Sequence, residues 1–212
     1  MIKINEIYKS IQGESSFAGQ PCVFIRTTFC NLRCRWCDTA YAFFEGEDQT
    51  QDAIISRVRS FETPLVEITG GEPLLQEGIY PLITRLLDEG FRVLIETSGS
   101  LPINRLDPRT LVIMDLKPPG SGMSHTIHWE NLTHLKPEDE VKFVISDRND
   151  FEWAKSVIGE NPSLNARTIL FSPVLDEMNP ALLSEWILKE NLPVRLSLQL
   201  HKLIWDKEMR GV

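Results

Sequence analysis

The sequence predicts an α/β fold in which parallel strands form an incomplete, TIM-like barrel with outer helices. Short apolar runs alternate with segments of helical periodicity, as in folds that cover a parallel sheet with helices. Polar and glycine-rich residues follow the predicted strands at their carboxyl ends, where such barrels place their active sites. No internal repeat, low-complexity tract or linker divides the 212 residues. We therefore expect one domain that covers residues 1–212.

The apolar runs predict strands at residues 22–26, 65–69, 92–96, 111–115, 141–145, 168–172 and 194–198. Apolar residues with helical spacing predict helices that contain residues 54–61, 79–87, 151–158 and 182–187. Gly90 is a natural carboxyl-terminal residue for the second helix. Residues 117–139 hold prolines, glycines and three of the four histidines without helical periodicity, so we expect the barrel to be abbreviated there.

Composition and charge exclude several classes of protein. With 22 basic and 30 acidic residues the formal net charge is -8, which argues against a nucleic-acid partner. The chain has no run of eighteen apolar residues and begins without the basic and apolar regions of a signal peptide. We expect a cytoplasmic enzyme without a membrane partner.

Three of the four cysteines, Cys30, Cys34 and Cys37, lie within eight residues. This spacing suits three corners of a [4Fe-4S] cluster, and the absence of a fourth cysteine would leave one iron open to a small molecule. A structural zinc site, with a histidine as fourth ligand, is the alternative. The four histidines lie far along the chain and not at finger-like spacing, which disfavours zinc. Cys22 lies in an apolar run and is expected in the core.

The cysteine motif, with Trp36 before its last cysteine, precedes Gly70-Gly71-Glu72-Pro73. In this order the two motifs resemble those of the radical S-adenosylmethionine (SAM) enzymes. Residues 8–15, 19–26 and 37–39 resemble, within that superfamily, the 7-carboxy-7-deazaguanine synthase family. The resemblance runs from about residue 4 to the end, and it is closest over the first hundred residues. It implies a barrel of the radical SAM type.

The resemblance also implies a reaction. The open iron would bind the amino and carboxylate groups of SAM, and reductive cleavage would give a 5'-deoxyadenosyl radical. That radical would take a hydrogen from C6 of 6-carboxy-5,6,7,8-tetrahydropterin, and ring contraction with loss of ammonia would yield 7-carboxy-7-deazaguanine, a precursor of queuosine.

The same resemblance assigns ligands by position. The implied SAM contacts are Trp36, Cys37, Asp38, Gly71, Glu72, Ser98, Asp115, Leu116, Lys117, Ser172, Pro173 and Val174. The implied substrate contacts are Ile11, Gln12, Gly13, Glu14, Arg26 and Thr69, where Arg26 would bind the carboxylate and Glu14 the guanidine-like edge. Contacts from Gln199, His201 and Val212 are left open.

Thr39 is the implied ligand of a Mg²⁺ ion that also touches the substrate, and the alternative is that it caps the next turn. The family further implies a homodimer and an electron donor such as flavodoxin or ferredoxin. Two other functions compete with this one. A radical-activating enzyme would act on a partner protein, and a zinc-binding interaction module would not be an enzyme.

Overall fold

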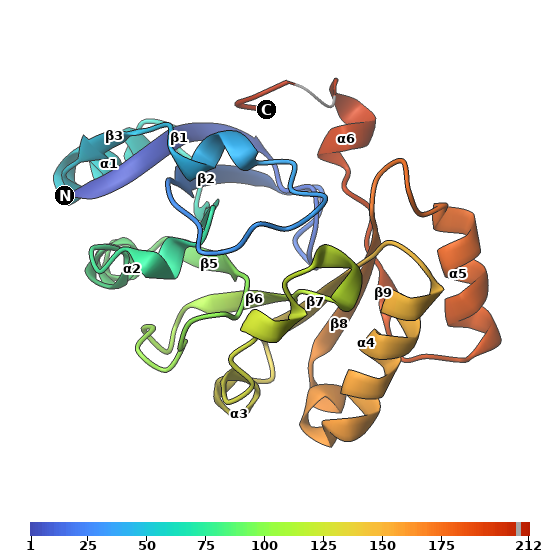
Figure 1. Cartoon of the computed structure of the whole chain (residues 1–212). Helices are drawn as coiled ribbons and strands as arrows, with labels where there is room; N and C mark the ends of the chain where they lie inside the picture. The colour runs from blue at the N-terminus through green and yellow to red at the C-terminus, as the bar shows by residue number, and fades with distance from the viewer. Residues whose placement is uncertain (207–208) are drawn as a thin grey trace.

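A curved, open sheet forms the centre of the fold (Figure 1). The computed structural model describes residues 1–206 and 209–212. Among them, nine strands form one sheet in the order β3-β1-β2-β4-β5-β6-β7-β8-β9. The strands are β1 (Ile2–Ile11), β2 (Pro21–Thr27), β3 (Glu47–Gln49), β4 (Leu65–Gly70), β5 (Arg92–Thr97), β6 (Leu111–Leu116), β7 (Glu140–Ile145), β8 (Thr168–Pro173) and β9 (Arg195–Leu196). From β2 through β4 to β9 all pairings are parallel, while β1 is antiparallel to both β2 and β3.

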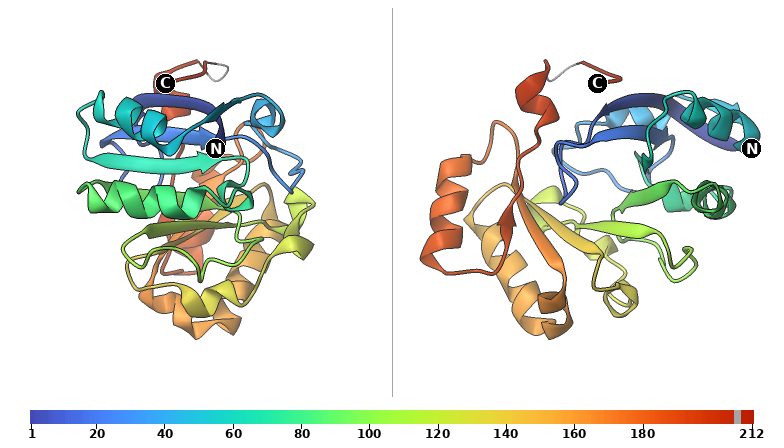
Figure 2. Two further views of the ribbon diagram at one scale, coloured as in Figure 1. Left: turned by 90° about the vertical axis from the view of Figure 1, so that its left-hand side faces the viewer. Right: turned by 180° about the vertical axis from the view of Figure 1, so that it is seen from behind.

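Helices cover the outside of this sheet (Figure 2). They are α1 (Gln51–Arg59), α2 (Ile79–Asp88), α3 (Asn131–His134), α4 (Arg148–Glu160) and α5 (Pro180–Lys189). The short α6 (His201–Ile204) stands apart from them, beside the carboxyl terminus (Figure 1). Short 3-10 turns are η1 (Ala40–Phe43), η2 (Pro73–Leu75), η3 (Pro119–Ser121), η4 (Ser124–Thr126) and η5 (Pro162–Ala166). Thr50, Asp147 and Asn179 each accept a backbone N–H at the start of α1, α4 and α5, which fixes where these helices begin.

Alternation along the parallel strands separates two cores. Outward side chains such as Val66, Ile68, Val93 and Phe143 pack against the helices in the main core. Inward side chains form a smaller cluster inside the barrel, made of Cys22, Phe24, Leu65, Leu94 and Ile113. Because successive side chains of a strand point to opposite faces, the inward positions above this cluster are free to carry polar groups.

The predicted α/β barrel is confirmed, with differences at its edges. All seven predicted strands occur, although the last is reduced to Arg195–Leu196. The prediction omitted β1 and β3. A bulge between Ile4 and Glu6 shifts the register of β1 and interrupts its apolar alternation, so the sequence pattern is weak there. The segment 117–139 forms only η3, η4 and α3, as its composition predicted. Within the described residues, no helix is long and apolar enough to cross a membrane.

Candidate active site

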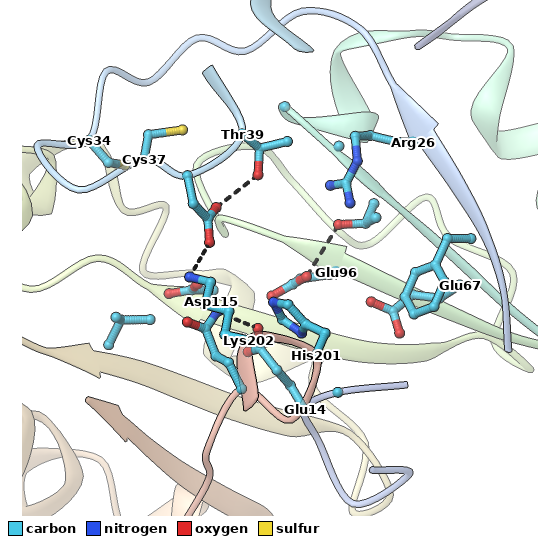
Figure 3. A pocket seen from close by; sticks show the side chains of 18 of the residues that line it. Glu14, Arg26, Cys34, Cys37, Thr39, Glu67, Glu96, Asp115, His201 and Lys202 are labelled. Atoms are coloured by element: carbon cyan, nitrogen blue, oxygen red, sulfur yellow. Dashed lines mark hydrogen bonds and ion pairs between the residues drawn. The ribbon is translucent and has the colours of Figure 1, made fainter. Parts of the chain in front are cut away.

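A cavity of about 590 Å³ opens at the carboxyl ends of the parallel strands. Its size is that of a small-molecule site. The loop that carries the three cysteines lies along one side, and the chain terminus, residues 209–212, lines another part. Figure 3 shows charged side chains from several strands pointing into the space between them.

The cysteine loop, residues 28–39, follows β2 and is held in place from two sides. Arg35 donates its backbone N–H to Ser121 (3.0 Å), and its guanidinium makes two hydrogen bonds with Glu177 (3.0 and 2.8 Å). On the other side, Glu72 donates its backbone N–H to the carbonyl of Phe29 at 2.8 Å. The loop is therefore fixed to the glycine motif, residues 70–73, through the backbone.

Gly71 explains why that motif needs glycine. A Cβ at this position would lie 2.0 Å from the Phe29 carbonyl oxygen and 2.9 Å from the Cβ of Cys30. Gly70 has a φ of +138°, a conformation that side chains rarely adopt. The motif can therefore pack directly against the cysteine loop only without side chains.

The three thiols line the cavity, are half-buried and form no disulfide. Burial raises the pKa of Cys34 to about 11, and the neighbouring Lys117 ammonium opposes that shift. No group of three His, Cys, Asp or Glu in residues 1–206 and 209–212 converges as ligands of one ion. A four-iron cluster needs no such convergence, since each cysteine binds a different iron. Three accessible thiols beside a cavity fit that cluster.

Glu72 connects the glycine motif to the loop after β5. Its buried carboxylate accepts hydrogen bonds from the Leu74 N–H (3.1 Å), the Thr97 hydroxyl (2.8 Å) and both the N–H and hydroxyl of Ser98 (2.8 and 2.6 Å). These four bonds occupy the carboxylate. In this structure Glu72 therefore positions Ser98, which lines the cavity.

Arg26 lies at one end of the cavity, surrounded by one carboxylate and two tyrosine side chains. Its Nε binds Glu6 at 2.7 Å, and one Nη donates to the Tyr8 hydroxyl at 2.9 Å. The Tyr41 hydroxyl donates to the same Glu6 at 3.0 Å. These bonds fix the guanidinium plane, and the side chain faces the cavity (Figure 3).

A charged floor, consisting of Lys142, Glu14, Glu96 and Asp115, lies opposite the cysteine loop. The Lys142 ammonium is 2.7 Å from Glu14 and 3.3 Å from Asp115, and it also binds Glu96. Burial alone would raise the pKa of Glu14, but Lys142 and the Gln199 amide lower it below its usual value. For Lys142, burial opposes the charge, but the Glu14 and Glu96 carboxylates hold the pKa well above normal.

Thr39 does not cap the turn that follows it. It occupies the N-cap position of η1 without a capping hydrogen bond from its side chain. Its hydroxyl instead donates to Asp38 at 2.8 Å, and Asp38 pairs with Lys202 of α6 at 2.6 Å. The segment after the last cysteine is therefore connected to the carboxyl-terminal helix.

Most of the implied contact residues line this cavity, and four do not. The lining includes Ile11, Gln12, Gly13, Glu14, Arg26, Trp36, Cys37, Asp38, Thr39, Thr69, Gly71, Ser98, Asp115, Lys117 and Val174. Glu72, Leu116, Ser172 and Pro173 are not among its lining residues, and Pro173 lines a neighbouring pocket instead. The Ser172 hydroxyl and one Asp115 oxygen are buried and find no partner among the described residues, so the hydroxyl can still donate to or accept from a ligand and the carboxylate oxygen can still accept.

The sequence reasoning missed several lining residues, among them Glu6, Tyr8, Tyr41, Glu67 and Lys142. Glu67 and Lys142 were detectable, because each is a charged residue with apolar neighbours on both sides within a strand. Gln199, His201 and Val212, left open above, also line the cavity.

The open parallel barrel, with three cysteines beside a glycine motif at the carboxyl ends of its strands, defines a radical SAM enzyme. Residues 24–114 match the family model for the radical SAM superfamily. The 7-carboxy-7-deazaguanine synthase of Chlorobaculum tepidum is 47% identical over 100% of this chain and 97% of its own length, and that of Koribacter versatilis is 44% identical over 100% of both. The crystal structure of QueE from Escherichia coli aligns with a TM-score of 0.78 at 26% identity over 94% of each chain. The chain belongs to the 7-carboxy-7-deazaguanine synthase family.

Proposed function

We propose that this chain converts 6-carboxy-5,6,7,8-tetrahydropterin to 7-carboxy-7-deazaguanine and ammonia, a step of queuosine and 7-deazapurine biosynthesis. The observation that carries the proposal is the distribution of charge in the cavity, with Arg26 at one end and the charged floor elsewhere. When bound, the cluster and SAM supply the radical that removes the C6 hydrogen. The protein binds and orients the pterin.

Arg26 would bind the carboxylate of the pterin. Its guanidinium is already fixed by Glu6 and Tyr8, so little side-chain freedom is lost on binding. Glu14 and Glu96 are hydrogen-bond acceptors held by Lys142, and they would accept from the guanidine-like edge of the ring. The backbone of Ile11, Gln12 and Gly13 and the hydroxyl of Thr69 complete the proposed substrate contacts.

We assign Cys30, Cys34 and Cys37 to the cluster, and we assign the neighbouring lining residues to SAM. Trp36, Asp38, Gly71, Ser98, Asp115, Lys117 and Val174 would contact SAM from the lining. The contribution of Leu116, Ser172 and Pro173 would come from the ends of β6 and β8, where the Ser172 hydroxyl is unpaired within the described residues. Glu72 would act by holding Ser98.

Thr39 would bind Mg²⁺. A hydroxyl that caps no helix and lies in the cavity beside the Asp38 carboxylate supports this assignment. Magnesium in proteins is usually held by few protein oxygens together with water and substrate. The ion would orient the pterin carboxylate against the ring.

We propose one domain over residues 1–212, supported by the continuous sheet from β3 to β9, together with a cytoplasmic location and a homodimer, as for the family. The electron donor would be an acidic protein such as flavodoxin or ferredoxin. Arg33 on the cysteine loop is exposed, and its guanidinium donates to the backbone carbonyls of Cys30 and Leu32, so its charge supports docking of an acidic donor there.

The test is anaerobic reconstitution of the cluster followed by incubation with dithionite, SAM, Mg²⁺ and the carboxylated tetrahydropterin. Because the pterin equals the deazapurine acid plus ammonia in composition, the abstracted hydrogen must return to the substrate-derived radical, so we expect 7-carboxy-7-deazaguanine in excess over 5'-deoxyadenosine. Formation of 5'-deoxyadenosine without the deazapurine would retain the radical SAM class but reject the proposed substrate. A colourless protein that binds zinc and leaves SAM intact would reject both.

A further inference from the structure

We propose that Glu67 is a further substrate-binding residue and that it meets the heterocycle as a hydrogen-bond donor. This inference rests on the proposed function, because it requires a flat, carbonyl-bearing ring in the cavity. The resemblance assigned no role to Glu67.

The position of Glu67 follows from the alternation of β4. Leu65 points inward into the small apolar cluster at the base of the barrel, and Thr69 lines the cavity two residues beyond Glu67. Glu67 therefore points inward between them. Its residual exposure is 2%, and it lines the cavity. Figure 3 shows it on the same side of the cavity as Arg26.

The hydrogen bonds of Gln12 define which Glu67 oxygen accepts. The Gln12 Oε1 accepts the backbone N–H of Glu14 at 2.6 Å, so its Nε2 is the donor to Glu67 Oε2, at 2.8 Å. The second Glu67 oxygen accepts no hydrogen bond from residues 1–206 and 209–212. If Glu67 carries a proton, that proton belongs on this second oxygen, as a donor available to a ligand.

The surrounding charges favour that proton. The titratable and charged groups around Glu67 are Tyr8 on β1, Glu14 after β1, Cys22 on β2, Glu96 on β5 and Lys142 on β7. Lys142 is the nearby cation, but its close partners are Glu14, Glu96 and Asp115. Burial first, and then the Glu96 charge, raise the pKa of Glu67 to about 8.

A buried neutral acid complements one feature of a pterin. The pyrimidinone ring carries a carbonyl that needs a donor, whereas its amino and N–H groups need acceptors such as Glu14 and Glu96. An ionised Glu67 would repel that carbonyl and would add a further negative charge beside Glu96. The neutral form therefore distinguishes a ring carbonyl from an amino group at that position.

The test compares Glu67→Gln, Glu67→Met and the matched control Glu140→Gln. An amide keeps the acceptor for Gln12 and the donor for the ligand, and it cannot ionise, while methionine removes both functions at similar volume. Glu140 is also buried, on β7, but it lies outside the cavity lining and accepts from Ser16. The readouts are the dissociation constant of 7-carboxy-7-deazaguanine by calorimetry, and KM for the pterin, between about pH 6 and 9.

We expect the unaltered chain and Glu140→Gln to bind the product more weakly above about pH 8. Glu67→Gln should bind within about twofold of the unaltered chain at pH 7 and should lack this basic loss. Glu67→Met should bind roughly tenfold more weakly, as expected for one lost buried hydrogen bond, with a parallel rise in KM.

Three results would overturn the inference. If Glu67→Gln is as defective as Glu67→Met at pH 7, the working form is the carboxylate. If Glu67→Met binds normally, Glu67 does not touch the ring. If Glu67→Gln keeps the basic loss, that loss does not come from ionisation of Glu67. Failure of the unaltered chain to bind or convert these compounds would instead reject the proposed function, and this inference with it.

Discussion

Replacing Lys142 with methionine should destabilise the fold by an amount that depends on pH. The buried ammonium contacts Glu14 at 2.7 Å and Asp115 at 3.3 Å, and it also binds Glu96. Methionine keeps most of the aliphatic volume but leaves Glu14 and Glu96 without this cation, whereas Asp115 keeps Lys117 at 2.9 Å. Removing one partner of a buried ion pair costs about 3–5 kcal/mol. A domain has about 5–15 kcal/mol of stability in total, so we expect a folded but weakened variant.

The sign of the pH dependence follows from the pKa shifts. Burial lowers the pKa of Lys142, but the opposite effect of Glu14 and Glu96 is larger, so the pKa in the folded chain is above its unfolded value. The stability that the ammonium contributes is therefore present below about pH 10 and is lost above it. Burial raises the pKa of Glu14, but the opposite effect of Lys142 is larger, so the pKa in the folded chain is below its unfolded value. The stability that the Glu14 carboxylate contributes is therefore present above about pH 4 and is lost in acid. In the unaltered chain the two contributions are therefore level from about pH 5 to 10.

In Lys142→Met, burial is opposed mainly by the weaker effect of the Gln199 amide, and the pKa of Glu14 should rise above its unfolded value. Such a carboxyl destabilises the fold as the pH rises through the unfolded pKa of about 4.3. The cost of the substitution should therefore be larger at pH 8 than at pH 5, by about 1.4 kcal/mol for each unit by which the pKa exceeds the unfolded value.

Urea denaturation at about pH 5 and about pH 8 measures this difference. Lys136→Met is the matched control, because Lys136 is 26% exposed and its partner Asp139 keeps backbone N–H donors from Val112 and Lys136. It should cost about 0–1 kcal/mol. An equal cost of Lys142→Met at both pH values would refute the reasoning, since Glu14 would then not depend on Lys142 for its ionisation.

Three further substitutions test individual cysteines and Thr39. Cys34→Ala should abolish iron retention and SAM cleavage, measured by visible absorbance and 5'-deoxyadenosine, and normal values would contradict the cluster assignment. Cys22→Ala should keep full iron content, because Cys22 is buried in the inner apolar cluster, and should lower the free energy of unfolding by about 1 kcal/mol; reduced iron would show a wrong assignment. Thr39→Ala should be slow with or without Mg²⁺, whereas chelation should slow only the unaltered enzyme; equal magnesium dependence of both would exclude Thr39 as a ligand.

Much of the fold could be predicted because buried parallel strands have a strong local pattern. The runs that contain Val66 and Ile68, or Val141 and Phe143, are apolar on the helix-facing side whatever their neighbours are. The edge strands are different. β1 has its alternation interrupted by a bulge, and β9 pairs with β8 over only two residues, so their limits depend on partners that the local sequence does not specify.

The candidate site divides in the same way. The cysteine motif and the glycine motif each occupy one short stretch of sequence, so their residues could be singled out from the sequence alone. The charged floor joins Glu14, Glu96, Asp115 and Lys142 from a loop and three different strands, and no spacing along the chain indicates which of them pair. The hydrogen bonds of Glu72 could not be predicted from the sequence either. Thr97 and Ser98 donate to it only because β5 lies next to β4 in the sheet.

Gly71→Ala should damage the cysteine loop more than the fold. The added methyl would lie 2.0 Å from the Phe29 carbonyl oxygen, which also accepts the Glu72 N–H, so the backbone before Cys30 must move. We expect lower iron content after reconstitution and slower SAM cleavage, with a smaller change in melting temperature. Gly159→Ala in α4 is the control, because its Cβ meets nothing within 4 Å and alanine should stabilise the helix by about 0.5–1 kcal/mol. If Gly71→Ala retained full iron and normal SAM cleavage, close contact between the two motifs would not be what positions the cluster ligands.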